Sequence, residues 1–223
     1  MYQFRKGTEL LDLCQRYELD INEIMLRCEM EESGQTREQI LSMMQNNLQV
    51  MQDSINRGLD PDLKSVGGLV GGNASKVQFY MEKDNLCGKT ILKAIAYALA
   101  VSECNAAMGK IVAATTAGAS GILPGILVAL AEEKGYSQEK LVKSVFVAAA
   151  IGKIIATNAT LSGAEGGCQA ECGSASSMAA AAAVFLAGGS PEMSLEAGAI
   201  ALKGLLGLVC DGRRVGEGAG SAG

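Results

Sequence analysis

The spacing of apolar residues in the first sixty positions predicts helices. Five apolar residues recur at intervals of three and four, as one face of a helix requires: Ile40, Met44, Leu48, Met51 and Ile55. Thr36 and Gln39 stand before this stripe in the order of a capping box, and Gly58 follows it where a C-terminal cap is expected. Residues 9–19 and 22–32 are also amphipathic, so we expect three helices within residues 1–60.

A loop containing Pro61 and the glycine-rich run 67–72 separates these helices from the rest of the chain. Beyond it, no sustained period-two alternation predicts strands. Helices are instead expected at residues 89–102, 137–156, 174–186 and 190–208. Ser137 and Ser190 are expected N-caps, with Pro191 in the first turn of the last helix. The predicted fold is therefore all-α, a closely packed Ala- and Gly-rich helical domain preceded by short amphipathic N-terminal helices.

The composition of the chain limits the kinds of active site and partner that it can have. The 223 residues contain no histidine, which excludes Ser-His-Asp triads, Cys-His dyads and histidine-ligated metal sites within the chain. A formal net charge of −5 without a basic patch disfavours nucleic acid as a partner. Seven cysteines and no apolar leader in residues 1–13 predict reduced thiols and a cytoplasmic location. Residues 111–131 and 172–191 are uncharged, but their small and polar residues favour buried packing over a membrane span.

Two glycine-rich stretches carry the candidate chemistry, residues 105–125 and 158–175. We expect turns there, with free backbone N–H groups that suit a carboxylate or a phosphate. The same glycines are also explained by close helix packing. In the second stretch, Glu165-Gly-Gly-Cys168 places a thiol among unhindered backbone, as a metal-ligating cysteine needs.

These stretches resemble the α subunits of the two-subunit, iron–sulfur-dependent L-serine dehydratases. The resemblance covers nearly the whole chain and is strongest at residues 162–171, 173–181, 188–192 and 206–211, with further matches at 71–76 and 105–125. It implies conversion of L-serine to pyruvate and ammonia with a [4Fe–4S] cluster and without pyridoxal phosphate. It also implies a β subunit as partner, in a heterodimer or a higher oligomer, and a catalytic domain at residues 61–211.

The resemblance assigns the ligands of the cluster. Cys168 and Cys210 match two of the three cysteines that hold it, which leaves one iron open to substrate. The third position falls near Ser221 in an atypical tail, residues 212–223, so we expect a C-terminally incomplete domain. The alternative is a truncated or frameshifted, non-catalytic helical remnant. Cys172 replaces an aliphatic residue of the family and is either a substitute ligand or a buried thiol. Thr115 replaces a proline, which is expected to loosen the substrate loop.

Eliminating water from serine needs help for the leaving hydroxide and a base for the α-proton. The candidate bases are Lys76, Glu171 and a residue of the β subunit. Three consecutive residues are expected to bind the serine carboxylate through backbone N–H groups and one hydroxyl: Thr116, Ala117 and Gly118. Lys76 is a second candidate for pairing with that carboxylate. Asn158 is placed with these substrate-binding residues.

Overall fold

The computed structural model describes residues 1–207, and within that part it contains nine helices and no strand. In chain order these are α1 (Gly7–Tyr17), α2 (Ile21–Ser33), α3 (Arg37–Gly58), α4 (Asn73–Met81), α5 (Lys89–Ala106), α6 (Ile122–Lys134), α7 (Gln138–Asn158), α8 (Gly163–Leu186) and α9 (Pro191–Gly204). The prediction of a mainly α-helical chain is confirmed. Residues 208–223, which include the predicted end of the last helix and the tail 212–223, lie outside the described residues.

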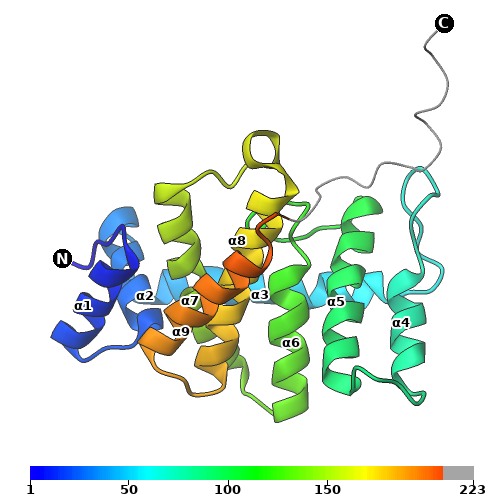
Figure 1. Cartoon of the computed structure of the whole chain (residues 1–223), viewed down its shortest axis with the longest axis horizontal. Helices are drawn as coiled ribbons and strands as arrows, with labels where there is room; N and C mark the ends of the chain where they lie inside the picture. The colour runs from blue at the N-terminus through cyan, green and yellow to red at the C-terminus, as the bar shows by residue number, and fades with distance from the viewer. Residues whose placement is uncertain (208–223) are drawn as a thin grey trace, which may run out of the picture.

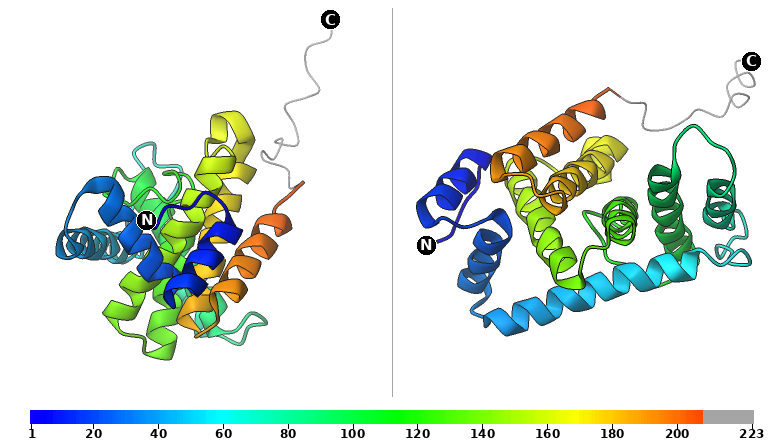
Figure 2. Two further views of the ribbon diagram at one scale, coloured as in Figure 1. Left: turned by 90° about the vertical axis from the view of Figure 1, so that its left-hand side faces the viewer. Right: turned by 90° about the horizontal axis from the view of Figure 1, so that it is seen from below.

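The long helix α3 runs along one side of the molecule (Figure 2). Helices α1 and α2 lie near one of its ends, and α4 and α5 lie near the other. Helices α6 and α7 pack directly on α3, whereas α8 packs on α6 and α7 and carries α9 on its outer side. The loop before α4, the loop before α6 and the N-terminal end of α8 lie along the same edge of the molecule (Figure 1). This edge holds most of the predicted site residues.

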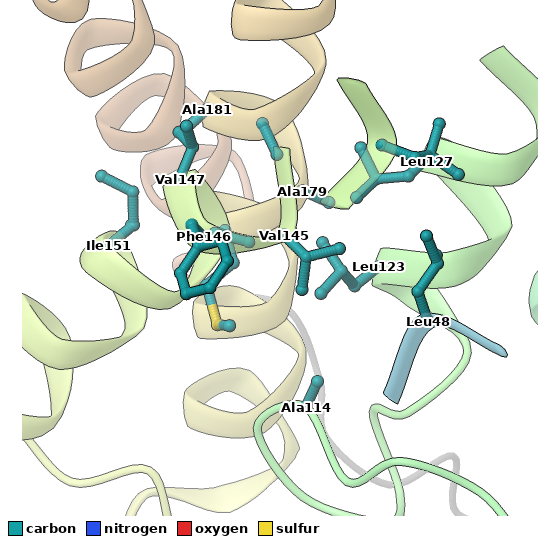
Figure 3. Packing of buried hydrophobic residues seen from close by; sticks show 14 of the residues in the cluster. Leu48, Ala114, Leu123, Leu127, Val145, Phe146, Val147, Ile151, Ala179 and Ala181 are labelled. Carbon is teal, nitrogen blue, oxygen red and sulfur yellow. The ribbon is translucent and has the colours of Figure 1, made fainter. Parts of the chain in front are cut away.

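Helix α7 occupies the centre of the hydrophobic core (Figure 3). Its buried side chains Val145 and Phe146 lie among Leu123 of α6 and Ala179 of α8. The alanines of α8 are small enough for the backbones of α7 and α8 to approach closely, and burial of each large apolar side chain contributes about 1.5–3 kcal/mol. The Ala-rich composition of the second half therefore serves helix packing.

Within residues 1–207, α7 is also the one helix whose length and composition would allow it to cross a membrane. Half of its most apolar stretch is buried inside the protein. The core helix of a packed domain has the same properties, and α7 contacts α2, α3, α6 and α8. Its apolar character is therefore explained by the core that surrounds it.

The start of α3 agrees with the predicted capping box. The Thr36 hydroxyl accepts a hydrogen bond from the backbone N–H of Gln39 (3.3 Å), and the Gln39 side chain accepts one from the N–H of Thr36 (2.9 Å). The prediction for Gly58 is wrong, because Gly58 is the last helical residue and Leu59 is the cap. A Cβ atom on Gly58 would lie 1.8 Å from the carbonyl oxygen of Ala100, so the glycine is required for the close approach of α3 and α5.

Two helices and one helix start differ most from the prediction. Helices α4 and α6 were not expected, and α8 begins at Gly163 instead of Ser174. The second glycine-rich stretch is therefore helical over most of its length, with a break at Gly167 (φ 71°, ψ −179°). Each glycine lowers helix propensity by about 1 kcal/mol, so the sequence favours a turn, and the packing of α8 overrides that preference. The first stretch agrees better, because residues 107–121 form a loop between α5 and α6.

Candidate active site

The structure brings Glu171 and the predicted substrate loop together. A methyl group placed on Gly118 would lie 3.4 Å from Oε2 of Glu171 and 3.8 Å from Oγ1 of Thr116. Glu171 comes from α8, and the other two residues come from the loop before α6. A carboxylate and a hydroxyl from distant parts of the chain therefore share one small space beside Gly118.

The break in α8 gives the Glu171 carboxylate its place. Because Gly167 is non-helical, the short turn that begins at Gly163 folds back over the side chain of Glu171. A Cβ atom on Gly163 would lie 2.6 Å from Cδ of Glu171 and 2.8 Å from both carboxylate oxygens. Only glycine leaves room for the carboxylate between this turn and the loop at Gly118.

Side chains inside the loop fix its shape. The carbonyl oxygen of Ala117 accepts hydrogen bonds from the Asn105 amide (3.4 Å) and from the Ser120 hydroxyl (2.7 Å). The Thr116 hydroxyl accepts a hydrogen bond from the backbone N–H of Ala119 (3.4 Å). Since the hydroxyl acts as an acceptor in this bond, its own proton can be donated to a ligand carboxylate.

Cys168 follows the break at Gly167 directly, and its side chain is exposed. Crowding on the preceding turn excludes a side chain at Gly166, where a Cβ atom would lie 2.6 Å from the Cβ of Ala170. Cys172 lies one helical turn further along and is half-buried. Cys168 is therefore exposed next to a crowded turn, and its role as a metal ligand stays a prediction.

The chain that follows α9 comes back to the part of α8 that carries Cys168. The backbone N–H of Gly207 donates a hydrogen bond to Oε1 of Gln169, the residue after Cys168 (3.4 Å). Gly207 is the last described residue, and Cys210 follows three positions later. Cys210 and Ser221 lie outside the described residues, so the pairing of Cys168 with Cys210 stays a prediction.

These donors fit an iron–sulfur cluster in part. Thiolates are the ligands that such clusters require, and Cys168 offers an exposed thiol at the edge where the chain leaves the described part. Among residues 1–207, no group of three cysteine and carboxylate side chains is close enough to hold a metal ion. Residues 1–207 therefore contain one candidate ligand, Cys168, and no complete set of ligands.

No contact described within residues 1–207 places Lys76 or Asn158 beside the group formed by Glu171, Thr116 and Gly118. Lys76 is exposed on α4. The Asn158 amide nitrogen donates to the carbonyl oxygens of Arg5 (2.7 Å) and Ile154 (2.8 Å), which uses both of its protons. Only the side-chain oxygen of Asn158 is available to accept a bond from a ligand.

Sequence analysis did not single out Glu103, a buried carboxylate of α5. Its Oε1 accepts a hydrogen bond from the backbone N–H of Asn73 (2.8 Å) at the N-terminus of α4, and its Oε2 has no partner among the described residues. Glu103 therefore anchors α4, which carries Lys76, to the end of α5. The sequence could have pointed to Glu103, because it lies on the same side of the predicted helix as the apolar residues Ala96 and Ala100. A charged residue on an apolar helix face needs a buried partner.

A second polar cluster lies among the N-terminal helices, around a cavity of about 540 Å³ lined by Tyr2, Glu23, Arg27, Met30, Glu31 and Arg37. Arg37 donates two hydrogen bonds to the Glu23 carboxylate (2.7 and 2.8 Å), and Arg27 donates a third (2.8 Å). The bonds from Arg37, reinforced by Arg27, hold the pKa of Glu23 below its usual value although burial opposes this. The cluster joins the starts of α2 and α3 and is distant in sequence from every candidate site residue.

The chain is similar in sequence to known serine dehydratases. The model of the "Serine dehydratase alpha chain" family matches residues 16–217. A probable L-serine dehydratase alpha chain of Bacillus subtilis is 46% identical over 209 residues, which cover 93% of this chain and 69% of that protein. An L-serine dehydratase alpha chain of Peptoniphilus asaccharolyticus is 40% identical over 92% of this chain and 70% of its own length. An L-serine dehydratase of Streptomyces coelicolor is 37% identical over 94% of this chain and 46% of its own length.

Proposed function

The chain belongs to the serine dehydratase alpha chain family, and we propose that it deaminates L-serine to pyruvate and ammonia as the α subunit of an iron–sulfur-dependent enzyme. The observation that supports this most directly is the position of the Glu171 carboxylate beside Thr116 and Gly118. It unites a candidate base with a loop suited to a carboxylate. The proposal includes a β subunit as partner and the cytoplasm as location.

Cys168 and Cys210 are the proposed cluster ligands, with Cys172 as the candidate substitute. When bound, the cluster supplies an open iron that acts as a Lewis acid on the serine hydroxyl. Cys168 is suited to this role because it is exposed and follows the break in α8. This part of the proposal concerns which residues hold the group, and it is tested by metal content.

The loop residues bind and orient the substrate in this proposal. Backbone N–H groups near Ala117 and Gly118 and the Thr116 hydroxyl receive the serine carboxylate. Glu171 then takes the α-proton, since its oxygens lie beside that loop. Lys76 and a residue of the β subunit are the remaining candidates for the base.

Anaerobic reconstitution with the β chain tests the ligand. Cys168→Ala should lose most of the bound iron and sulfide, whereas Cys87→Ala, at another exposed cysteine, should bind as much as the unmodified chain. Equal iron content in the two variants would contradict the assignment. Cys172→Ala decides whether that thiol substitutes for a ligand.

A matched pair of carboxylate variants tests the base. Glu171→Gln should lower kcat by about 10²–10⁴-fold, the usual contribution of a positioned base, with iron content unchanged. Glu196→Gln, at an exposed position on α9, should leave kcat unchanged. Retention of full activity by Glu171→Gln would leave Lys76 and the β subunit as the sources of the base.

A further inference from the structure

Exposed large apolar side chains concentrate at one end of the molecule. Fifteen such residues occur within residues 1–207, and nine of them fall in the 43 positions from Val66 to Met108. This segment comprises α4, α5 and the loops around them, which form the end of the molecule opposite α1 (Figure 1). Concentrations of this kind on a protein surface mark interfaces, whereas single exposed apolar residues are ordinary.

One part of this surface lies at the turn between α4 and α5. Five exposed residues belong to it: Phe79, Tyr80, Leu86, Ile91 and Ile95. Ile91 and Ile95 are one helical turn apart on α5 and continue toward Ser102, which is also exposed, so they form a solvent-facing stripe. Helices α3, α4 and α6 cover the other sides of α5, which leaves this stripe without a partner among residues 1–207.

The other part lies beside the candidate active site. Four exposed residues belong to it: Val66, Leu69, Val70 and Met108. The backbone N–H of Val66 donates a hydrogen bond to the carbonyl oxygen of Ala106 (3.3 Å), so the loop before α4 lies against the start of the substrate loop. The apolar surface is therefore continuous along the chain with the loop that carries Thr116 and Gly118.

Lysines flank this surface. Five lysines and three acidic residues occur from Asn73 to Lys110, and one of the three, Glu103, is buried, although the whole chain has a net charge of −5. Lys89 and Lys93 are paired with Glu82 and Glu132. No ion pair is described within residues 1–207 for Lys76 or Lys83. A partner suited to this face presents apolar side chains with carboxylates at the rim.

The relatives indicate what that partner is. This chain corresponds to 69–70% of the two alpha chains but to 46% of the Streptomyces coelicolor protein, whose name carries no chain designation. The Streptomyces protein therefore contains a segment beyond the length of an alpha chain. A second polypeptide that provides such a segment has to meet the alpha chain at some surface.

We propose that the α4–α5 face, from Val66 to Met108, is the docking surface for the β chain. This inference rests on the proposed function, since it assumes a two-chain enzyme. The face gives the partner an apolar contact flanked by lysines, and the partner then lies directly beside the substrate loop. The exposed residues Met193 and Ile200 of α9 form a smaller apolar surface, which serves as the matched control.

The test measures binding of the cognate β chain to the full chain by isothermal titration calorimetry. Phe79→Asp and Ile91→Asp replace side chains that are 70% and 56% exposed, so the helices should keep their melting temperature. Each should weaken binding at least tenfold. Met193→Asp and Ile200→Asp, at 55% and 71% exposure, should leave the affinity unchanged. Leu69→Asp in the loop provides a second variant that tests the same face without touching a helix.

Three results would overturn the proposal. The first is unchanged affinity in Phe79→Asp, Ile91→Asp and Leu69→Asp. The second is weakened binding only in the α9 variants. The third is a dimer of this chain alone that Phe79→Asp dissociates, since the face would then bind a second copy. A complex that forms and loses affinity as expected, yet makes no pyruvate from L-serine, would contradict the proposed function and leave the docking surface intact.

Discussion

The hydroxyl oxygens of Thr115 and Ser174 lie 3.1 Å apart and join the substrate loop to α8 across 59 residues of sequence. Ser174 also lies 2.5 Å from the carbonyl oxygen of Ala170, which can only accept. Ser174 therefore donates to Ala170 and receives the proton of Thr115. Ser174 is buried, so this chain of two hydrogen bonds fixes the loop against the helix that carries Glu171.

Removal of either hydroxyl should destabilise the protein through this shared bond. Thr115→Val and Ser174→Ala should each lower the free energy of unfolding by about 1 kcal/mol, which corresponds to about 2–4 °C in Tm for a chain of this size. The double variant should cost less than the sum of the two single variants. Ser102→Ala is the control, because its exposed hydroxyl donates to the carbonyl oxygen four residues earlier without any tertiary partner. Strict additivity in the double variant would contradict the proposed bond.

Sequence analysis predicted the elements whose signals are local. Thr36, Ser137 and Ser190 cap the helices that they were expected to cap, because a cap depends on a few neighbouring residues. Helix α8 and Gly58 were mispredicted because their conformations depend on distant contacts. The glycines of α8 make room for Glu171 and Leu202, and Gly58 makes room for Ala100.

The candidate site shows the same limit. Sequence analysis named Glu171 as one candidate base and the 116–118 loop as a candidate carboxylate site, and the structure places them together. Nothing in the sequence indicated that the amide of Asn158 is bonded to Arg5, since a contact across 153 positions leaves no periodic pattern. The same holds for Thr115 and Ser174. The kinds of residue at the site and the local secondary structure could therefore be predicted from the sequence, whereas the hydrogen-bond partners of the side chains could not.

The crossing of α3 and α5 should not tolerate even a methyl group. A Cβ atom at Gly58 would overlap the backbone of Ala100, which cannot rotate away as a side chain can. Gly58→Ala should therefore lower the free energy of unfolding by about 3 kcal/mol, as overpacking against a rigid neighbour does. Urea unfolding measures this. Gly204→Ala, where no atom lies within 4 Å, should change stability by less than about 1 kcal/mol. Equal stability of the two variants would contradict the close approach.

Glu23 should make the stability of the N-terminal helices depend on pH. The pKa of its carboxyl is lower in the folded protein than in the unfolded chain because Arg37 and Arg27 donate to it. Its ionised form therefore stabilises the fold above the unfolded pKa, about 4.3, and this contribution is lost as pH falls through the folded pKa.

Glu23→Gln tests this dependence. Its side chain is only 16% exposed, so the substitution should cost about 1–2 kcal/mol at pH 7. The difference from the unmodified chain should be smaller at pH 3 than at pH 7, because acid brings the solution closer to the lowered pKa of the folded carboxyl and begins to protonate it. Urea unfolding at both pH values measures it. Glu133→Gln, at an exposed position on α6, is the control and should show no difference at either pH. A cost that is constant with pH would show that the carboxylate charge is not the cause.

Gly163→Ala should separate activity from stability. The added Cβ would lie 2.6–2.8 Å from the carboxyl group of Glu171, the far end of a flexible side chain. The carboxylate can swing away at little cost to the fold, so Tm should change by no more than about 2 °C. That movement would take the proposed base away from Gly118, and kcat should fall at least tenfold, since small displacements of a positioned group are costly. Gly204→Ala serves again as the control and should keep both quantities. A loss of kcat that is matched by loss of iron would indicate that the turn before Cys168 was disturbed. A normal kcat would show that Glu171 does not need the space that Gly163 leaves, and would remove the geometric support for its role as the base.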